Sequence, residues 1–316
     1  MNKPESRAVP LDGAKVAEEI KSEVAQKVRT LRERYDYQPS LVVVRVGEDP
    51  ASVVYVRNKV RTSEELGLRS ELQVLPADTS LTQLLEIIET LNKRDDVDGI
   101  LVQLPLPKQI DEATVIQAVD PAKDVDGFHP VNIGRLVLGQ VGLVACTPSG
   151  IIQMLEKSGI EIRGQQACVV GRSNIVGKPM AHLLLQRDAT VTICHSRTRD
   201  LPAVTREADI LIAAIGRPGL IRGEFIKPGA TVIDVGMNRV SDVRQAEDLF
   251  GADAGRRVEI IKQKGATLVG DVHPAEAAAV AGRLTPVPGG VGLLTVATLM
   301  QNTLRAAIMR NKFVLS

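Results

Sequence analysis

Three side chains that can exchange protons with a ligand, Ser52, Tyr55 and Lys59, are spaced three and four residues apart. On a helix this spacing places a hydroxyl, a phenol and an amine on one face. A tyrosine and a lysine one turn apart are also common on exposed helix faces. The spacing therefore identifies a candidate binding or proton-transfer face and leaves the exposed-face alternative open.

The apolar run Gly99–Leu104 predicts a buried strand that contains one amide side chain. Gln103 lies at the carboxyl end of this run, where open α/β sheets place their ligands, and we expect it near Tyr55 and Lys59. The alternative is an amide that only satisfies the backbone of the following turn.

Two acids, Asp124 and Asp126, precede Gly127. No calcium-loop series follows them, so we expect no metal. A carboxylate beside a glycine turn could accept hydrogen bonds from an amine and ring N–H groups of a substrate; an Asx-type turn is the alternative.

A glycine-rich loop, Gly171–Gly177, lies between a predicted strand and a predicted helix. This context presents backbone N–H groups and a helix N-terminus to a pyrophosphate, although the spacing departs from G-x-G-x-x-G. The next strand ends in Ser196 and Arg197 without an acid for the ribose 2′-OH, and with Arg172 these residues favour NADP over NAD. Both arginines could instead be solvated, and His195 is expected to be structural.

A second loop rich in glycine and proline, Thr285–Gly292, enters the last predicted helix. Such a loop either shapes a rigid wall beside a ligand or only makes a turn, and the sequence leaves both readings open.

The elements around these residues alternate between strand and helix in two series, which predicts an α/β fold. The second series reads as a Rossmann-type, doubly wound parallel sheet, because its strands are near-continuous apolar runs. Residues 105–148, dense in Gly, Pro and Asp, are expected to hold the connection between two domains, and ATLVGDV (266–272) is expected to be the last strand. The polar, charged stretch between Asn238 and Gly265 fits neither pattern. Helices are expected over 13–34, 52–66, 112–119, 149–158 and 295–309, with further strands over 41–46, 167–171, 190–195, 209–216 and 231–236.

Composition excludes several classes of protein. The chain has 316 residues, 39 Lys and Arg against 38 Asp and Glu, and 44% hydrophobic residues, which fits about two domains with a real core. The net charge of +1 and the seven aromatic residues (Trp 0, Tyr 3, Phe 4) speak against nucleic-acid binding. No apolar run reaches the roughly 18 residues of a membrane helix, and the three separated cysteines fit a reducing cytoplasm.

The motifs together resemble the bifunctional methylenetetrahydrofolate dehydrogenase/methenyltetrahydrofolate cyclohydrolase family over nearly the whole chain. The resemblance implies a folate-binding catalytic domain over 1–147, completed by a helix at 294–316, and an NADP-binding domain over 148–293. It implies oxidation of 5,10-methylenetetrahydrofolate and hydrolysis of the methenyl product in one cleft between the domains. In order, the matching motifs are Tyr55-x-x-x-Lys59, GILVQLPLP, KDVDGFHP, CTPSG, GRSNIVGKPM, CHSRT, DVGMNR, GDV and TPVPGGVG.

The resemblance also implies roles for individual residues. Lys59 matches the acid/base residue of the hydrolysis, Gln103 would orient its amine, Tyr55 would lie against the folate, and Asp126 would accept from the pterin. Leu104, Pro288, Gly289 and Gly290 match substrate-side positions. The positions expected to contact NADP are Gly171, Arg172, Ser173, Ile175, Ser196, Arg197, Met237 and Thr295.

The sequence departs from the family pattern at several places. Leu293 and Leu294 replace a usual Pro-Met, which makes the loop less stiff, and Ala145 and Met237 replace a usual Pro and Ile. Residues 240–264 are longer than the corresponding family loop.

A dehydrogenase without hydrolysis, and a non-catalytic NADP- or folate-binding protein, stay open as alternatives. The order of the motifs argues against a short-chain dehydrogenase, in which the nucleotide loop precedes the Tyr-Lys helix. The resemblance alone implies a homodimer.

Overall fold

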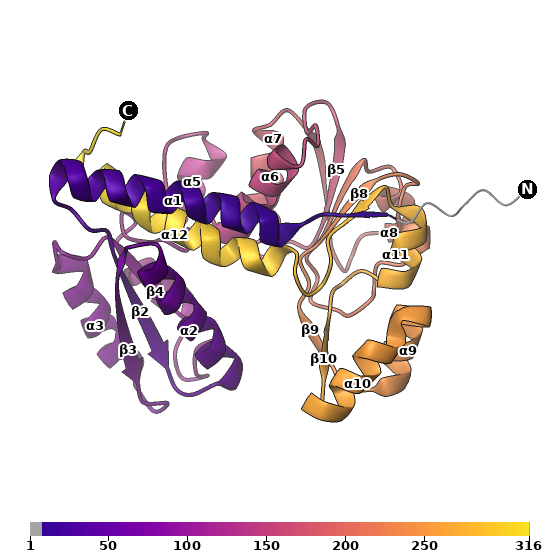
Figure 1. Ribbon diagram of the computed structural model, residues 1–316, viewed down its shortest axis with the longest axis horizontal. Helices are drawn as coiled ribbons and strands as arrows, with labels where there is room; N and C mark the ends of the chain where they lie inside the picture. The colour runs from indigo at the N-terminus through magenta and orange to yellow at the C-terminus, as the bar shows by residue number, and fades with distance from the viewer. Residues whose placement is uncertain (1–7, 316) are drawn as a thin grey trace, which may run out of the picture. The chain divides into compact units, whose positions relative to one another are not determined.

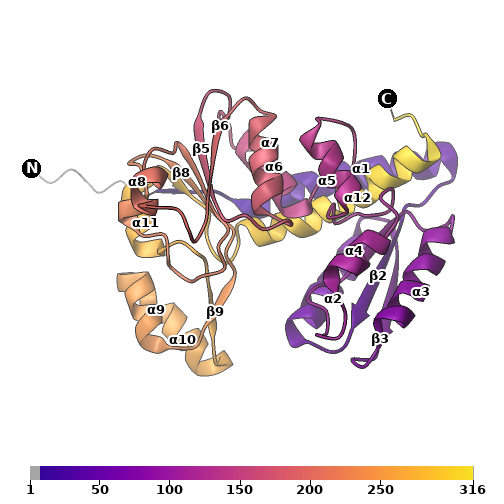
Figure 2. The same cartoon turned by 180° about the vertical axis from the view of Figure 1, so that it is seen from behind.

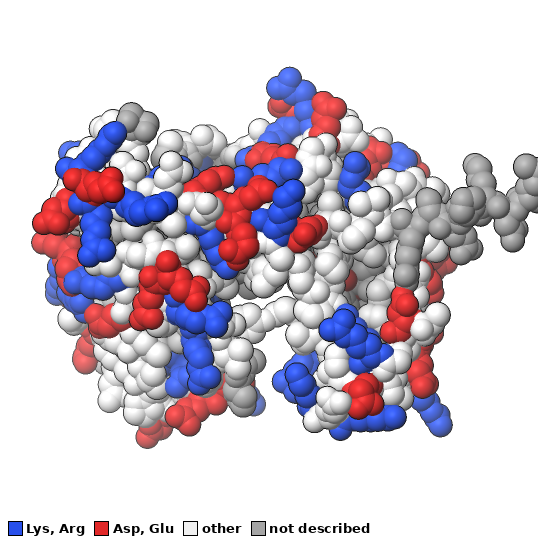
Figure 3. All heavy atoms as spheres, viewed as in Figure 1, with Lys and Arg blue, Asp and Glu red and all other residues white. Residues whose placement is uncertain are grey.

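The computed structural model describes residues 8–315 and divides them into two compact units. We call residues 17–146 and 295–315 the three-stranded unit, and residues 8–16 and 147–294 the six-stranded unit, after their main sheets. Residues 1–7 and Ser316 of the expected domain ranges lie outside the described residues. On the face shown in Figure 3, acidic and basic side chains are interspersed.

The three-stranded unit contains a parallel sheet in the order β3-β2-β4, with β2 in the centre. Strand β2 is buried along its whole length because helices cover both faces of the sheet, and alternate residues enter different cores. The strands are β2 (Ser40–Val46), β3 (Arg69–Leu75) and β4 (Gly99–Val102).

Two long helices, α1 (Gly13–Tyr35) and α12 (Val291–Asn311), share one core of this unit and lie side by side (Figures 1 and 2). Buried Val24, Val28 and Leu31 form the apolar stripe of α1 that the sequence predicts. The remaining helices are α2 (Pro50–Glu65), α3 (Leu81–Lys93), α4 (Glu112–Ala118) and α5 (Pro130–Val137).

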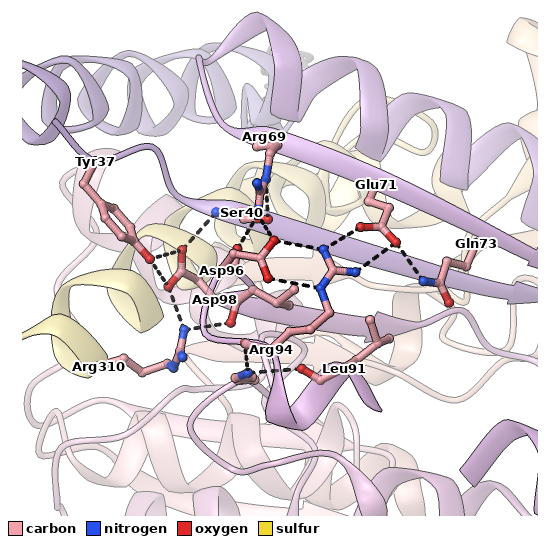
Figure 4. Close-up of polar contacts among 12 residues, drawn as sticks. Tyr37, Ser40, Arg69, Glu71, Gln73, Leu91, Arg94, Asp96, Asp98 and Arg310 are labelled. Carbon is pink, nitrogen blue, oxygen red and sulfur yellow. Dashed lines mark hydrogen bonds and ion pairs between the residues drawn. The ribbon is translucent and has the colours of Figure 1, made fainter. Parts of the chain in front are cut away.

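A buried carboxylate ties α12 to the sheet of this unit (Figure 4). Asp98, which is fully buried, accepts hydrogen bonds from the Tyr37 hydroxyl at 2.9 Å, the Ser40 backbone N–H at 3.0 Å and Arg310 Nη1 at 2.8 Å. Burial raises the pKa of Asp98, and burial together with Asp98 raises the pKa of Tyr37 to about 12. The three donors compensate for the desolvation of the carboxylate.

We expect D98A to lower the free energy of unfolding by about 3 kcal/mol, because it leaves a partly buried guanidinium and a partly buried phenol without this acceptor. Urea denaturation of wild type and variant measures this difference. Asp96 offers a control because its ion pairs with Arg69 and Arg94 are exposed, so D96A should cost less than about 1 kcal/mol. Equal losses in the two variants would contradict the assignment.

The six-stranded unit contains a wholly parallel sheet in the order β1-β11-β8-β7-β5-β6. Order and direction agree with the doubly wound sheet that the sequence predicts. The strands are β1 (Val9–Pro10), β5 (Gln166–Val170), β6 (Thr190–Cys194), β7 (Ile210–Ala213), β8 (Thr231–Asp234) and β11 (Arg283–Leu284), and the helices are α6 (Cys146–Lys157), α7 (Gly177–Leu185), α8 (Leu201–Thr205) and α11 (Pro274–Val280).

The first described residues belong to the six-stranded unit, whereas the sequence reading placed all of 1–147 in the other domain. The reason is the pairing of β1 with β11, which extends the six-stranded sheet. Both strands have two residues and are too short to produce a recognisable apolar pattern.

The expectation that 266–272 forms the last strand of the parallel series is wrong. Strand β10 (Thr267–Val269) pairs antiparallel with β9 (Asn238–Val240) in a separate two-stranded sheet. Between them, α9 (Val243–Phe250) and α10 (Ala254–Lys264) form a helical hairpin out of the segment that fitted neither pattern (Figure 1). Along residues 8–315, no helix combines the length and apolarity needed to cross a membrane.

Candidate active site

Lys59 and Gln103 form a direct pair in the three-stranded unit. Lys59 Nζ donates a hydrogen bond to Gln103 Oε1 at 3.0 Å, and only 9% of Lys59 is exposed. Gln103 Nε2 donates to the Leu104 carbonyl at 2.5 Å, which fixes the amide with its oxygen toward the lysine. A neutral acceptor thus orients the amine without an opposite charge beside it.

The local structure explains why these side chains meet. Asp49 caps α2 by accepting from the Ser52 N–H at 2.8 Å, and the helix then carries Ser52 and Lys59 on its buried side. Gln103 continues β4, and its N–H donates to the Val44 carbonyl of β2 at 2.8 Å. Tyr55 is partly buried between Ser52 and Lys59, and burial raises its pKa.

The two acids beside Gly127 have different environments. Asp124 is buried and accepts from Asn132 Nδ2 at 2.9 Å and the His129 N–H at 2.8 Å, so it organises its own turn. The Asp126 carboxylate makes no hydrogen bond among the described residues and is partly exposed. Burial raises the pKa of Asp126 to about 6, Lys59 opposes this shift, and Asp124 adds to it. Asp126 is therefore the acid that is available to a ligand.

A small hollow lies next to this carboxylate inside the three-stranded unit. Its volume is about 340 Å³ with the open mouth included, and Leu104, Asp126 and Phe128 are among the residues that line it. Most of its wall is apolar. Asp124 also lines it, but the hydrogen bonds of its own turn occupy that carboxylate. A mostly apolar wall with the Asp126 carboxylate as an acceptor suits a flat ring that carries N–H donors.

The second group of candidates lies at the carboxyl edge of the six-stranded sheet. Gly171 follows β5 with a φ of +133°, and a side chain there would collide with the Ala214 carbonyl. A side chain at Gly177 would collide with the backbone of Gly171. Ser173 Oγ accepts from the N–H groups of Val176 and Gly177 at 3.1 and 3.2 Å, which holds the loop at the start of α7.

The end of β6 is bound to this loop, because the Gly171 N–H donates to the Cys194 carbonyl at 2.9 Å. The His195 N–H donates to Thr198 Oγ1 at 2.9 Å, and the Arg197 N–H donates to His195 Nδ1 at 3.1 Å, which closes a turn. Ser196 and Arg197 are exposed on this turn. The same sheet edge also has Arg172 and Ile175 exposed, and Met237 is exposed beyond the end of β8.

The structure does not bring all expected substrate contacts into one unit. Tyr55, Lys59, Gln103, Leu104 and Asp126 belong to the three-stranded unit. Pro288, Gly289 and Gly290 belong to the six-stranded unit, and Thr295, expected near NADP, belongs to the three-stranded unit. In their own unit Pro288 and Gly289 are exposed, while Gly290 is buried against Pro286.

Two buried acids, Asp234 and Asp271, organise this sheet edge, and the sequence motifs that contain them assigned them no role. The Asp271 carboxylate accepts from the N–H groups of Ile215, Gly216 and Arg217 at 2.5 to 2.9 Å. Asp234 accepts from the N–H groups of Asp271 and Val272, and burial raises its pKa to about 7. A single acid at the end of an apolar run, as in TVIDVG and ATLVGDV, was the available signal. Among residues 8–315, no group of His, Cys, Asp or Glu side chains could hold a metal ion.

Comparison with known proteins identifies relatives over nearly the whole chain. The NAD(P)-binding domain of tetrahydrofolate dehydrogenase/cyclohydrolase matches residues 145–311, and the catalytic domain of the same family matches residues 11–126. The bifunctional protein FolD of Koribacter versatilis is 55% identical over 303 residues, 96% of this chain and 98% of its own. FolD of Moorella thermoacetica is 54% identical over 297 residues, 94% of this chain and 98% of its own.

Solved structures agree with these relatives. The bifunctional enzyme FolD of Campylobacter jejuni has a TM-score of 0.86 at 39% identity, covering 97% of this chain and 100% of its own. The Trypanosoma brucei enzyme, solved in complex with NADP cofactor and an inhibitor, has a TM-score of 0.87 at 38% identity, covering 99% and 100%. With both family domains matched and relatives above half identity along nearly its whole length, this chain belongs to the tetrahydrofolate dehydrogenase/cyclohydrolase family.

Proposed function

We propose that this protein oxidises 5,10-methylenetetrahydrofolate with NADP⁺ to the 5,10-methenyl form and hydrolyses that product to 10-formyltetrahydrofolate in one-carbon metabolism. The observation that carries the proposal is the buried Lys59 amine, held 3.0 Å from the Gln103 amide oxygen. Lys59 also interacts electrostatically with the Asp126 carboxylate, which accepts no hydrogen bond from the residues that the structure describes. Folate or NADP binding alone has no need of a positioned amine of this kind.

Hydrolysis requires that water attacks the amidinium carbon of the methenyl group and loses a proton. Lys59 is the group that takes or relays this proton, and Gln103 directs its Nζ. Asp126 accepts hydrogen bonds from the pterin amino and ring N–H groups, and Tyr55 lies against the folate. Leu104 and the loop with Pro288, Gly289 and Gly290 supply the further substrate contacts of the proposal.

The carboxyl edge of the six-stranded sheet fits NADP. The Gly171 turn leaves no room for a side chain, so backbone can approach a pyrophosphate there, and the N-cap residue of α7, Val176, makes no side-chain cap. Gly171, Arg172, Ser173, Ile175, Ser196, Arg197, Met237 and Thr295 would hold the cofactor. When bound, NADP⁺ supplies the acceptor for the hydride of the one-carbon bridge.

The test is an absorbance assay of the purified protein with 5,10-methylenetetrahydrofolate and NADP⁺, which follows NADPH and the methenyl product separately. Both activities together produce NADPH without accumulation of the methenyl form. Accumulation of methenyl product in the wild type would leave a dehydrogenase alone, and absence of NADPH would favour a binding protein.

We expect the double variant R172Q/R197Q to raise KM for NADP⁺ by about 100-fold while KM for NAD⁺ changes less than about threefold. The two exposed guanidinium groups would bind the 2′-phosphate, which NAD⁺ lacks. Initial rates with each cofactor measure the ratio. R163Q, which removes an exposed arginine from the far end of β5, is the control. A parallel rise for both cofactors would contradict this role.

The assembly as a homodimer and the location in the cytoplasm belong to the same proposal. The three cysteines, all free and buried, support a reducing compartment. Light scattering of the purified protein tests the dimer.

A further inference from the structure

We infer that Arg257, in the helical hairpin of α9 and α10, positions the substrate-side loop 286–290. Arg257 Nη2 donates a hydrogen bond to the Val287 carbonyl at 2.7 Å. This carbonyl directly precedes Pro288, a residue proposed to contact the folate. The inference deepens the proposed function and rests on it.

The guanidinium of Arg257 connects the hairpin to the loop through several contacts. It lies 4.6 Å from the centre of the Phe250 ring of α9, and Nη1 also reaches the Leu268 carbonyl of β10 at 3.4 Å. Arg257 is only partly exposed, and burial lowers its pKa. Each of these partners is uncharged, so the planar group acts as a multiple donor rather than as half of an ion pair.

The loop itself has few means of holding its position. Pro286 and Pro288 lack a backbone N–H, and Pro288 and Gly289 are exposed. Thr285 anchors the entry, because its Oγ1 accepts from the Asp234 N–H at 2.7 Å. Within the described residues, Arg257 provides the one side-chain hydrogen bond to residues 286–289.

Packing does not replace this hydrogen bond on the hairpin side. A hollow of about 330 Å³, its opening included, lies against the loop and is lined by Phe250, Pro286 and Val287 among others. Because space remains beside Pro286 and Val287, the loop can shift once the hydrogen bond is lost. We therefore expect Arg257 to act on folate binding and not on NADP⁺ binding at the β5 and β6 edge.

Steady-state kinetics of R257M, R257K and R256M test this assignment. R257M should raise KM for 5,10-methylenetetrahydrofolate by about tenfold, while kcat and KM for NADP⁺ stay within about twofold of wild type. R257K keeps one donor of the right charge and should limit the rise to about threefold. R256M removes the neighbouring exposed charge, which makes no hydrogen bond among the described residues, and should behave as wild type.

Two results would overturn the inference in an active enzyme: an unchanged KM for folate in R257M, or an equal rise for folate and NADP⁺ with a matching loss of thermal stability. If R257M does not fold, R257K decides, because a wild-type KM in R257K contradicts the inference. A wild-type protein that forms no NADPH is a different failure. It overturns the proposed function, and the inference with it.

Discussion

K59M is expected to form NADPH at a rate within about tenfold of wild type while the methenyl product accumulates, because hydrolysis falls by about 10³-fold or more. Methionine keeps the length and the buried apolar stem of Lys59 and removes only the amine that Gln103 orients at 3.0 Å. Oxidation depends mainly on holding substrate and cofactor together, which needs no proton from this amine. Absorbance of NADPH and of the methenyl form separates the two steps.

Arg61, an exposed residue of the same helix, provides the control for charge and for helix stability. R61M should retain both steps. If K59M lost both activities in equal measure while its thermal unfolding stayed that of wild type, Lys59 would serve binding and not proton transfer. Unchanged hydrolysis in K59M would exclude it from the reaction.

D126N is expected to lower kcat/KM for 5,10-methylenetetrahydrofolate by about 100-fold or more. The carboxylate has no hydrogen-bond partner among the described residues, so its acceptor capacity is available to the pterin N–H groups. An amide in its place presents an N–H donor to those donors, which loses a charge-assisted bond and adds a mismatch. Initial rates at varied folate, with NADP⁺ saturating, measure the loss.

The pH dependence gives a second readout of Asp126. Burial raises its pKa to about 6, so the binding-competent carboxylate is lost as the pH falls through 6. Wild-type kcat/KM for folate should therefore fall about tenfold per unit below pH 6 and level off above it. This limb should be absent in D126N. A limb that persists unchanged in D126N belongs to another group.

Asp124 distinguishes a ligand-binding acid from a structural one. Its carboxylate is occupied by Asn132 and by the N–H groups of Phe128 and His129, so D124N should lower thermal stability. D126N should leave stability unchanged or improve it above pH 6. Because the pKa of Asp126 is raised from 3.8 to about 6 in the folded protein, its ionisation lowers the free energy of unfolding as the pH rises through this range. The loss remains in full above pH 6. Equal loss of stability in both variants would contradict this division.

Much of the candidate site follows from local patterns in the sequence. The helical period alone was enough to predict that Ser52 and Lys59 share one face of a helix. The end of a buried apolar run was enough to predict the position of Gln103, which the structure places next to β2. The glycine at 171 is explained by a turn that has no room for a side chain. The order of motifs and the apolar runs were enough to predict the doubly wound sheet, because a strand buried on both faces has a distinctive composition.

Contacts between residues far apart in the chain were decided by the tertiary structure. Strands β1 and β11 form by pairing with each other across more than 270 residues, and no two-residue segment contains enough pattern to reveal that partner. The hairpin of α9 and α10 could not be predicted from the sequence for a related reason, because only its packing distinguishes it from a polar loop.

The same limit applies to single side chains. Sequence alone determined which residues carry functional groups suited to the proposed proton transfer, folate contact and NADP contact. It did not determine that Asp124 is occupied while Asp126 is available, or that Arg257 reaches Val287. Those roles depend on which donors and acceptors remain after folding has paired the others, and this is a property of the whole three-dimensional arrangement.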